Sequence, residues 1–110
     1  MQTTIETFEQ IDMRTGTIVS AKEFPKAKKP AYQLQIDFGN EVGIKKSSAQ
    51  ITNIYSIEEL IGKQVIAVVN FPPRQIADFM SECLVLGLNT EAGVVLLQPG
   101  QKIDNGLRVC

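Results

Sequence analysis

A chain of 110 residues is long enough for one domain, and its 44% hydrophobic content is ordinary for a globular protein. The sequence has no apolar run as long as a membrane-spanning helix, and its first residues lack the basic and apolar regions of a signal peptide. The absence of histidine excludes Ser-His and Cys-His nucleophile pairs and histidine metal ligands, and Cys83 and Cys110 are too distant to form a zinc site. We therefore expect a cytoplasmic, non-catalytic protein with two free thiols, no metal and no cofactor.

Charge is unevenly distributed along the chain. The net charge of −1 argues against a strongly basic nucleic-acid-binding protein. Residues 22–46, however, hold six lysines against three acidic residues, a net charge of +3. Such a basic patch can contact phosphate, with Lys28 and Lys29 as candidates, although a solvated lysine-rich loop explains the same residues.

The N-terminal segment, residues 1–11, is predicted to form a short amphipathic helix. Thr3 and Glu6 have the spacing of a capping box. Apolar residues recur at helical spacing, namely Ile5, Phe8 and Ile11. So short a helix is not stable alone and must pack on the end of the domain or on another subunit.

Three strands are predicted next. Residues 12–23 predict a long strand, with a bulge at Gly16 where the apolar residues change parity. Residues 31–38 alternate between apolar and polar side chains, as in a half-buried strand. Gly39-Asn40 predicts a two-residue hairpin turn, and residues 41–48 predict a third strand with Val42 and Ile44 pointing inward.

Residues 55–62 predict a helix, in which Ser56 is the N-cap, Glu59 completes a capping box and Gly62 ends the helix. After it come two continuous apolar runs, 65–69 and 84–88, each of which predicts a buried strand. The segment between them contains Pro72-Pro73, where strand pairing must stop because proline has no amide hydrogen. Such an exposed loop on a rigid scaffold is a favourable place for a binding site, although an ordinary connection would explain it too.

This order, β-β-β-α-β-β with a bent first strand, predicts an all-β fold with short helices, namely a five-stranded OB-fold Greek-key barrel. An SH3-like barrel is the alternative, but it lacks the helix between the third and fourth strands. The whole chain, 1–110, forms one domain, and residues 94–110 form a C-terminal extension. One small barrel cannot cover all the apolar residues at the two ends of the chain, so we expect a homodimer. The predicted interface residues are Ile5, Phe8, Val95, Leu97, Ile103, Leu107 and Val109.

Several stretches together resemble the tRNA-binding domain of the EMAP-II type, which also ends many methionyl-tRNA synthetases: DMRTGTI, DFG, IYSIEELIGK, VVNFPPR and SECLVL. Within that family the chain resembles most the CsaA group, whose pattern is matched over nearly all of residues 7–108. The resemblance implies a homodimeric OB-fold chaperone of protein export and, more broadly, tRNA binding through the OB-fold surface. Gln50, Cys83 and Leu84 differ from the residues at these positions in tRNA-binding members.

Two functions follow as hypotheses. The first is a chaperone that binds unfolded or extended polypeptides on apolar residues of the 71–80 segment, with polar contacts to the peptide backbone. The second is a module for tRNA or structured RNA on the same surface, with lysines on phosphate. The candidate binding residues are Asn70, Phe71, Pro73, Arg74, Phe79, Ser81, Glu82, Lys45, Lys46 and Ser48, and the additional phosphate contacts are Lys28 and Lys29. A catalytic carboxylate pair, Asp78 and Glu82, is better explained as solvated loop charges.

Overall fold

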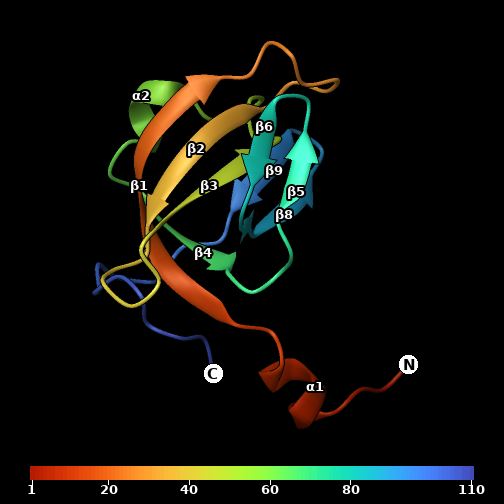
Figure 1. The fold of residues 1–110 in the computed structure, drawn as a ribbon, viewed down its shortest axis with the longest axis vertical. Coiled ribbons are helices and arrows are strands. Elements are labelled where there is room, and N and C mark those ends of the chain that lie inside the picture. Colours follow the sequence, from red (N-terminus) through yellow and green to blue (C-terminus); the bar gives the residue numbers. More distant parts are fainter.

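Five antiparallel strands form a nearly closed barrel in the computed structural model, which describes residues 1–110 (Figure 1). The strands lie in the order β3-β2-β1-β4-β7. Their bounds are Met13–Glu23 for β1, Tyr32–Asp37 for β2, Ile44–Ala49 for β3, Gln64–Val68 for β4 and Leu84–Val85 for β7. The short helix α2, Ile57–Leu60, connects β3 to β4. The predicted element order and OB-fold architecture are therefore confirmed.

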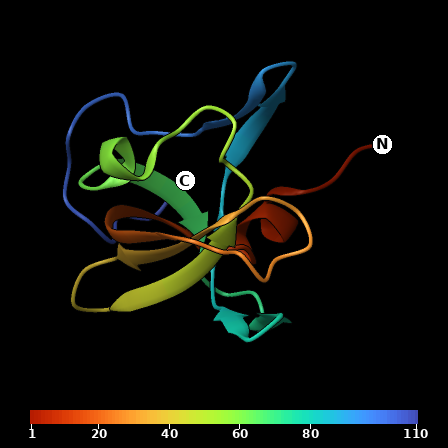
Figure 2. The same ribbon diagram turned by 90° about the horizontal axis from the view of Figure 1, so that it is seen from above.

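Two hairpins and one helix are attached to this barrel. β5 (Arg74–Ile76) pairs with β6 (Phe79–Ser81), and β8 (Gly87–Thr90) pairs with β9 (Gly93–Leu96). Figure 2 shows the two hairpins extending to different sides of the barrel. The helix α1, Ile5–Glu9, precedes β1 and contains no buried residue. No helix of the chain is long and apolar enough to cross a membrane.

The core lies between the strands and follows the predicted alternation. Leu34 and Ile36 of β2 are fully buried, and so is Phe38 just after it. Ile18 of β1 and Val65 of β4 meet them from the neighbouring strands and are equally buried. Because these strands contribute one apolar face each, the barrel interior is filled without any disulfide.

The bulge in β1 lies further along the strand than predicted. The pairing register with β2 shifts between Ile18 and Ser20, not at Gly16. Gly16 is required by packing instead, because a Cβ there would lie 2.6 Å from Cγ2 of Ile36 and 2.7 Å from a ring carbon of Phe38. The change of parity of the apolar residues therefore indicates the bulge, whereas the glycine at position 16 is explained by its close contact with Ile36 and Phe38.

Three further predictions are wrong in detail. The connection between β2 and β3 is a longer turn, in which the amide of Phe38 donates to the carbonyl of Gly43 at 3.0 Å. Ile44 begins β3 beyond that turn and is 59% exposed, not inward. The N-cap of α1 is Thr4, whose hydroxyl accepts from the amide of Thr7, so the Thr3 capping box does not form.

The capping box of α2 is confirmed, since Ser56 and Glu59 exchange both hydrogen bonds. The prediction of one buried strand over residues 84–88 is wrong. This run is divided between β7 and β8, and its ends, Leu84 and Leu88, are 47% and 60% exposed. The chain leaves the barrel sheet after Val85 to enter the β8–β9 hairpin, and the exposed Leu84 forms part of the site described next.

Candidate binding groove

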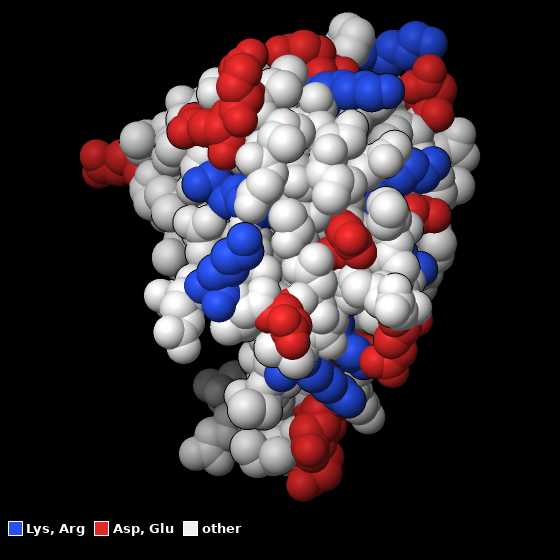
Figure 3. Space-filling view, turned by 90° about the vertical axis from the view of Figure 1, so that its left-hand side faces the viewer, with Lys and Arg blue, Asp and Glu red and all other residues white.

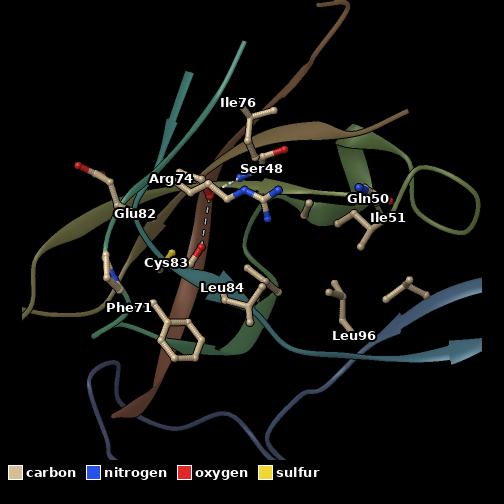
Figure 4. Close-up of a pocket in the computed structure, with 15 residues that line it drawn as sticks. Ser48, Gln50, Ile51, Phe71, Arg74, Ile76, Glu82, Cys83, Leu84 and Leu96 are labelled. Carbon is tan, nitrogen blue, oxygen red and sulfur yellow. Dashed lines mark hydrogen bonds between the residues drawn. The ribbon is translucent and has the colours of Figure 1, made fainter. Parts of the chain in front are cut away.

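An apolar groove lies between the end of β3, strand β7 and the double-proline loop (Figure 4). Its volume is about 460 Å³, within the range typical of ligand sites. Nine of its 15 lining residues are hydrophobic, so it suits apolar groups. The lining residues are Ser48, Ala49, Gln50, Ile51, Phe71, Pro72, Arg74, Ile76, Ser81, Glu82, Cys83, Leu84, Val85, Val94 and Leu96.

The apolar wall of the groove exists because the prolines interrupt strand pairing. β4 ends at Val68, and pairing resumes only at Arg74, in a separate two-stranded sheet. Phe71 lies in this interruption and is 45% exposed. Together with the exposed Leu84 it places two large apolar side chains beside one cavity. Exposed apolar clusters of this kind are typical of interaction sites.

One wall of the groove is fixed by hydrogen bonds between β3 and residues 81–82, at the end of β6. The amide of Lys46 donates to Oε1 of Glu82 at 2.9 Å, and the amide of Glu82 donates to the carbonyl of Lys46 at 2.7 Å. The amide of Ser48 donates to Oγ of Ser81 at 3.1 Å. Because β3 is an edge strand, these bonds satisfy amides that have no strand partner.

A second hollow of about 530 Å³ adjoins the groove, and we call it the basic hollow. It shares Ser48, Gln50, Arg74 and Ile76 with the groove. Its other lining residues are Lys26, Ala27, Lys28, Lys29, Ala31, Gln75 and Ala77. The hollow is therefore bounded by the lysine-rich loop after β1 and by the β5–β6 hairpin.

The charges around the basic hollow are only partly compensated. Nζ of Lys26 lies 2.9 Å from Oδ2 of Asp78, and this hydrogen bond lowers the pKa of the Asp78 carboxyl. Lys28, Lys29 and Arg74 form no ion pair within the chain. Arg74 is the one charged residue that lines both cavities, and in Figure 4 its guanidinium extends toward Gln50, away from Phe71.

Half of the binding residues predicted from the sequence border the groove. The structure brings together Ser48, Phe71, Arg74, Ser81 and Glu82 at this cavity. Their convergence from β3, the proline loop and the hairpin gives a surface with both apolar and polar groups. At the double proline, Pro72 lines the groove and Pro73 does not.

The other predicted binding residues lie outside the groove. Phe79 packs against Phe24, with ring centroids 5.4 Å apart, and the ammonium of Lys46 lies 5.4 Å from the same Phe79 ring. Lys45 precedes Lys46 on β3 and borders neither cavity. The side chain of Asn70 is engaged within the chain, because its Oδ1 accepts from the amide of Asp12 at 2.9 Å and its Nδ2 donates to the carbonyl of Gln10 at 2.8 Å.

Sequence reasoning missed the part of the groove formed by closure of the barrel. The missed lining residues are Ala49, Gln50, Ile51, Cys83, Leu84, Val85, Val94 and Leu96. They come from segments that meet only in three dimensions, and most are apolar residues that also fit a core. The exposure of Leu84 depends on the chain leaving the sheet after Val85, for which the sequence carries no local signal.

The residues predicted at a subunit interface divide into two groups. Ile5, Phe8, Val95 and Leu107 are exposed, and Leu97, Ile103 and Val109 are half-buried in their own chain. The C-terminal tail is bonded to β1, since the amide of Thr15 donates to the carbonyl of Leu107 at 3.0 Å and the amide of Val109 to that of Met13 at 2.9 Å.

Comparisons with known proteins agree with this architecture. Residues 13–108 match the family described as a putative tRNA-binding domain. The structure is similar to the CsaA chaperone protein from Picrophilus torridus, with a TM-score of 0.95 and 51% identity over 99% of this chain and 100% of that one. It is also similar to the chaperone CsaA from Bacillus anthracis, with a TM-score of 0.93 and 50% identity over the whole of both chains.

Methionine–tRNA ligases contain a related segment. The ligase of Archaeoglobus fulgidus is 33% identical to this chain over 106 residues. The match covers 96% of this chain but only 16% of that ligase. The chain therefore corresponds to a small part of such an enzyme.

Proposed function

The chain belongs to the family of putative tRNA-binding domains, within its CsaA group, and on this premise we propose that it is a homodimeric chaperone that binds unfolded or extended polypeptides in the groove during protein export. The chain is a CsaA-like tRNA-binding domain, which is a non-catalytic module. The observation that carries the proposal is the position of the exposed side chains of Phe71 and Leu84 beside a cavity of about 460 Å³. Unfolded chains expose apolar side chains that such a surface can cover.

The polar groups around the groove suit an extended polypeptide. Gln50 and Arg74 offer side-chain donors beside the apolar wall, and an extended peptide has unpaired main-chain carbonyls that need them. Pro72 keeps the loop stiff, so little conformational freedom is lost on binding.

Binding of a denatured protein tests this function. We expect the full chain to bind a permanently unfolded polypeptide, and Phe71→Ser to weaken binding by about ten- to a hundredfold, because a buried phenyl ring stabilises a complex by about 1.5–3 kcal/mol. Met80→Ser is the matched control, since Met80 is 39% exposed on the adjacent hairpin but lines neither cavity. Equal loss of binding in both variants, or no binding by the unaltered chain, would reject the function.

We propose the dimer on the exposed apolar residues at the two ends of the chain. α1 buries none of its residues, and Ile5 and Phe8 are 68% and 37% exposed. Leu88 and Val95 on the β8–β9 hairpin are 60% and 37% exposed. Light scattering at micromolar concentration is expected to give twice the mass of the chain. A monomeric mass would refute the proposed assembly.

A tRNA-binding module is the second candidate, favoured by the family match and by the basic hollow. Lys28, Lys29 and Arg74 would contact phosphates there. So few contacts predict weak binding with a shallow dependence on salt. Retention of tRNA in a filter-binding assay at low salt, lost in Lys28→Gln/Lys29→Gln, would support this function, and no retention would eliminate it.

A further inference from the structure

We propose that the groove selects polypeptide segments in which a carboxylate stands beside apolar residues, and that Arg74 binds this carboxylate where the groove meets the basic hollow. The inference rests on the proposed function of the groove as a polypeptide site. It adds the chemical class of the preferred segment and the residue that sets the preference.

Charge complementarity is the first argument. The residues that line the two cavities include four cations, Lys26, Lys28, Lys29 and Arg74, against the single anion Glu82, a net charge of +3 on a chain whose total is −1. Asp78 compensates Lys26 from outside the lining and reduces this local charge to +2. The ligand that matches such a surface is an anion.

The anion Glu82 does not compensate Arg74. One oxygen of the Glu82 carboxylate accepts the amide of Lys46 at 2.9 Å, and no ion pair joins Glu82 to Arg74. In Figure 4 the side chain of Glu82 and the guanidinium of Arg74 extend in different directions. The donor fork of Arg74 is therefore available to a ligand. A guanidinium binds a carboxylate through two parallel hydrogen bonds, which makes it selective for this group.

The position of Arg74 gives the second argument. It lines both cavities, whereas Phe71 and Leu84 line only the groove and the unpaired lysines only the basic hollow. A ligand bound to Arg74 and to the apolar wall must carry an acidic group next to an apolar one. Figure 3 shows charges of both signs interspersed over the side of the molecule that lies at the left in Figure 1.

The composition of the lining favours a polypeptide over RNA as the anionic ligand. Single-stranded RNA is held by stacking its bases on aromatic side chains. Phe71 is the one aromatic residue in the lining of the two cavities, and the other apolar lining residues are aliphatic, proline or cysteine. Such a surface suits aliphatic side chains of a polypeptide.

Fluorescence anisotropy with labelled peptides tests the preference. Peptides share one apolar core and carry Glu, Gln or Lys beside it, each with an amidated C-terminus, and a further Gln peptide carries a free C-terminal carboxylate. We expect the Glu peptide to bind the full chain about tenfold more tightly than the Gln peptide, and the Lys peptide to bind most weakly. The free-acid arm shows whether a terminal carboxylate replaces the side chain.

Arg74→Gln is expected to abolish the difference between the Glu and Gln peptides. Lys102→Gln removes one positive charge outside both cavities and is expected to retain the difference. Circular dichroism verifies that both variants are folded. Equal affinity of the Glu and Gln peptides, or a preference that survives in Arg74→Gln, overturns the proposal, although binding of all peptides would still support the polypeptide site.

Two further outcomes separate the alternatives. Binding of no peptide, together with no binding of a denatured protein, overturns both this proposal and the proposed function. In the second, a single-stranded oligonucleotide and the Glu peptide compete separately with the bound Gln peptide. If the oligonucleotide displaces the Gln peptide more effectively than the Glu peptide does, and Arg74→Gln removes this advantage, Arg74 binds RNA and the carboxylate preference is overturned.

Discussion

Two hydrogen bonds between Glu82 and Lys46 join the edge of β3 to the segment between β6 and β7. The amide of Lys46 donates to the Glu82 carboxylate at 2.9 Å, and the amide of Glu82 donates to the Lys46 carbonyl at 2.7 Å. The Glu82 side chain thus accepts a β3 amide that a neighbouring strand would bind elsewhere in the barrel, and so helps to close the barrel. The same contact fixes one wall of the groove.

Removal of this side-chain acceptor is expected to weaken the barrel. Glu82→Ala leaves the Lys46 amide without its partner and should lower the free energy of unfolding by about 1–2 kcal/mol. Glu82→Gln is the control, since its amide oxygen can still accept. Urea unfolding of both variants measures the effect. Equal stability of Glu82→Ala and the unaltered chain would show that the bond does not contribute to closure.

A pH-dependent contribution is expected from Asp12. Its carboxylate accepts from Nε of Arg14 at 2.6 Å and from Nη2 at 3.2 Å, and the hydrogen bond to Arg14 lowers the pKa of Asp12 from its ordinary value of 3.8. A lowered pKa stabilises the folded state above the ordinary value, and this stabilisation is lost as the pH falls through the folded pKa.

Asp12→Asn should therefore lower the free energy of unfolding at pH 7 by about 1–2 kcal/mol, and the deficit should shrink below about pH 4. Urea unfolding at a series of pH values measures this dependence. A deficit that stays constant down to pH 2 would mean that packing, not the charge, explains the loss.

The turn of the β5–β6 hairpin contains a strained residue. Ala77 has φ of 53°, and it is the one residue other than glycine with a positive φ. Glycine adopts this conformation without steric cost. Ala77→Gly is expected to raise the free energy of unfolding by about 0.5–1 kcal/mol.

Ala27→Gly is the matched control, because Ala27 has a negative φ and glycine there adds only freedom to the unfolded chain. It should destabilise the protein slightly. Thermal unfolding compares the two variants. If both lower the melting temperature, the turn at Ala77 is not strained.

The barrel was predictable because its signals are local. The alternation in β2 places Leu34 and Ile36 in the core, and Ser56 with Glu59 forms the capping box of α2 as the spacing indicates. The turn after β2 was predicted too short. Gly39 does have the positive φ of a tight hairpin turn, but the backbone hydrogen bonds that close this turn reach Gly43. Similar residues serve both kinds of turn.

The groove was predictable only in part. Phe71 and Arg74 could be identified because Pro72-Pro73 must interrupt pairing beside them. Gln50 and Leu84 could not, since their placement depends on how two sheet edges meet and on where the chain leaves the barrel. For Asn70 the sequence indicated a loop position but not the main-chain partners that it binds.

The two cysteines should differ sharply in reactivity. Burial raises the pKa of the Cys83 thiol to about 12, and Cys110 is exposed. The thiolate is the reactive form, so at pH 8 Cys83 is almost wholly unreactive in the folded protein. Titration with a thiol reagent should label one cysteine per chain, and both in denaturant. Cys110→Ser should abolish labelling of the folded protein, and continued rapid labelling of that variant would contradict the burial of Cys83.

We expect Asn70 to stabilise the position of the N-terminal helix rather than to bind a ligand. Its side chain accepts from the amide of Asp12 and donates to the carbonyl of Gln10, the C-cap of α1. Asn70→Ala removes both bonds, and α1 buries no residue of its own, so we expect amide exchange of Phe8 and its neighbours to accelerate about tenfold or more. Asn70→Asp keeps the acceptor for Asp12 and should show a smaller effect. Hydrogen exchange measured by mass spectrometry distinguishes the roles, because a residue that served only as a ligand contact would leave exchange in α1 unchanged while weakening peptide binding.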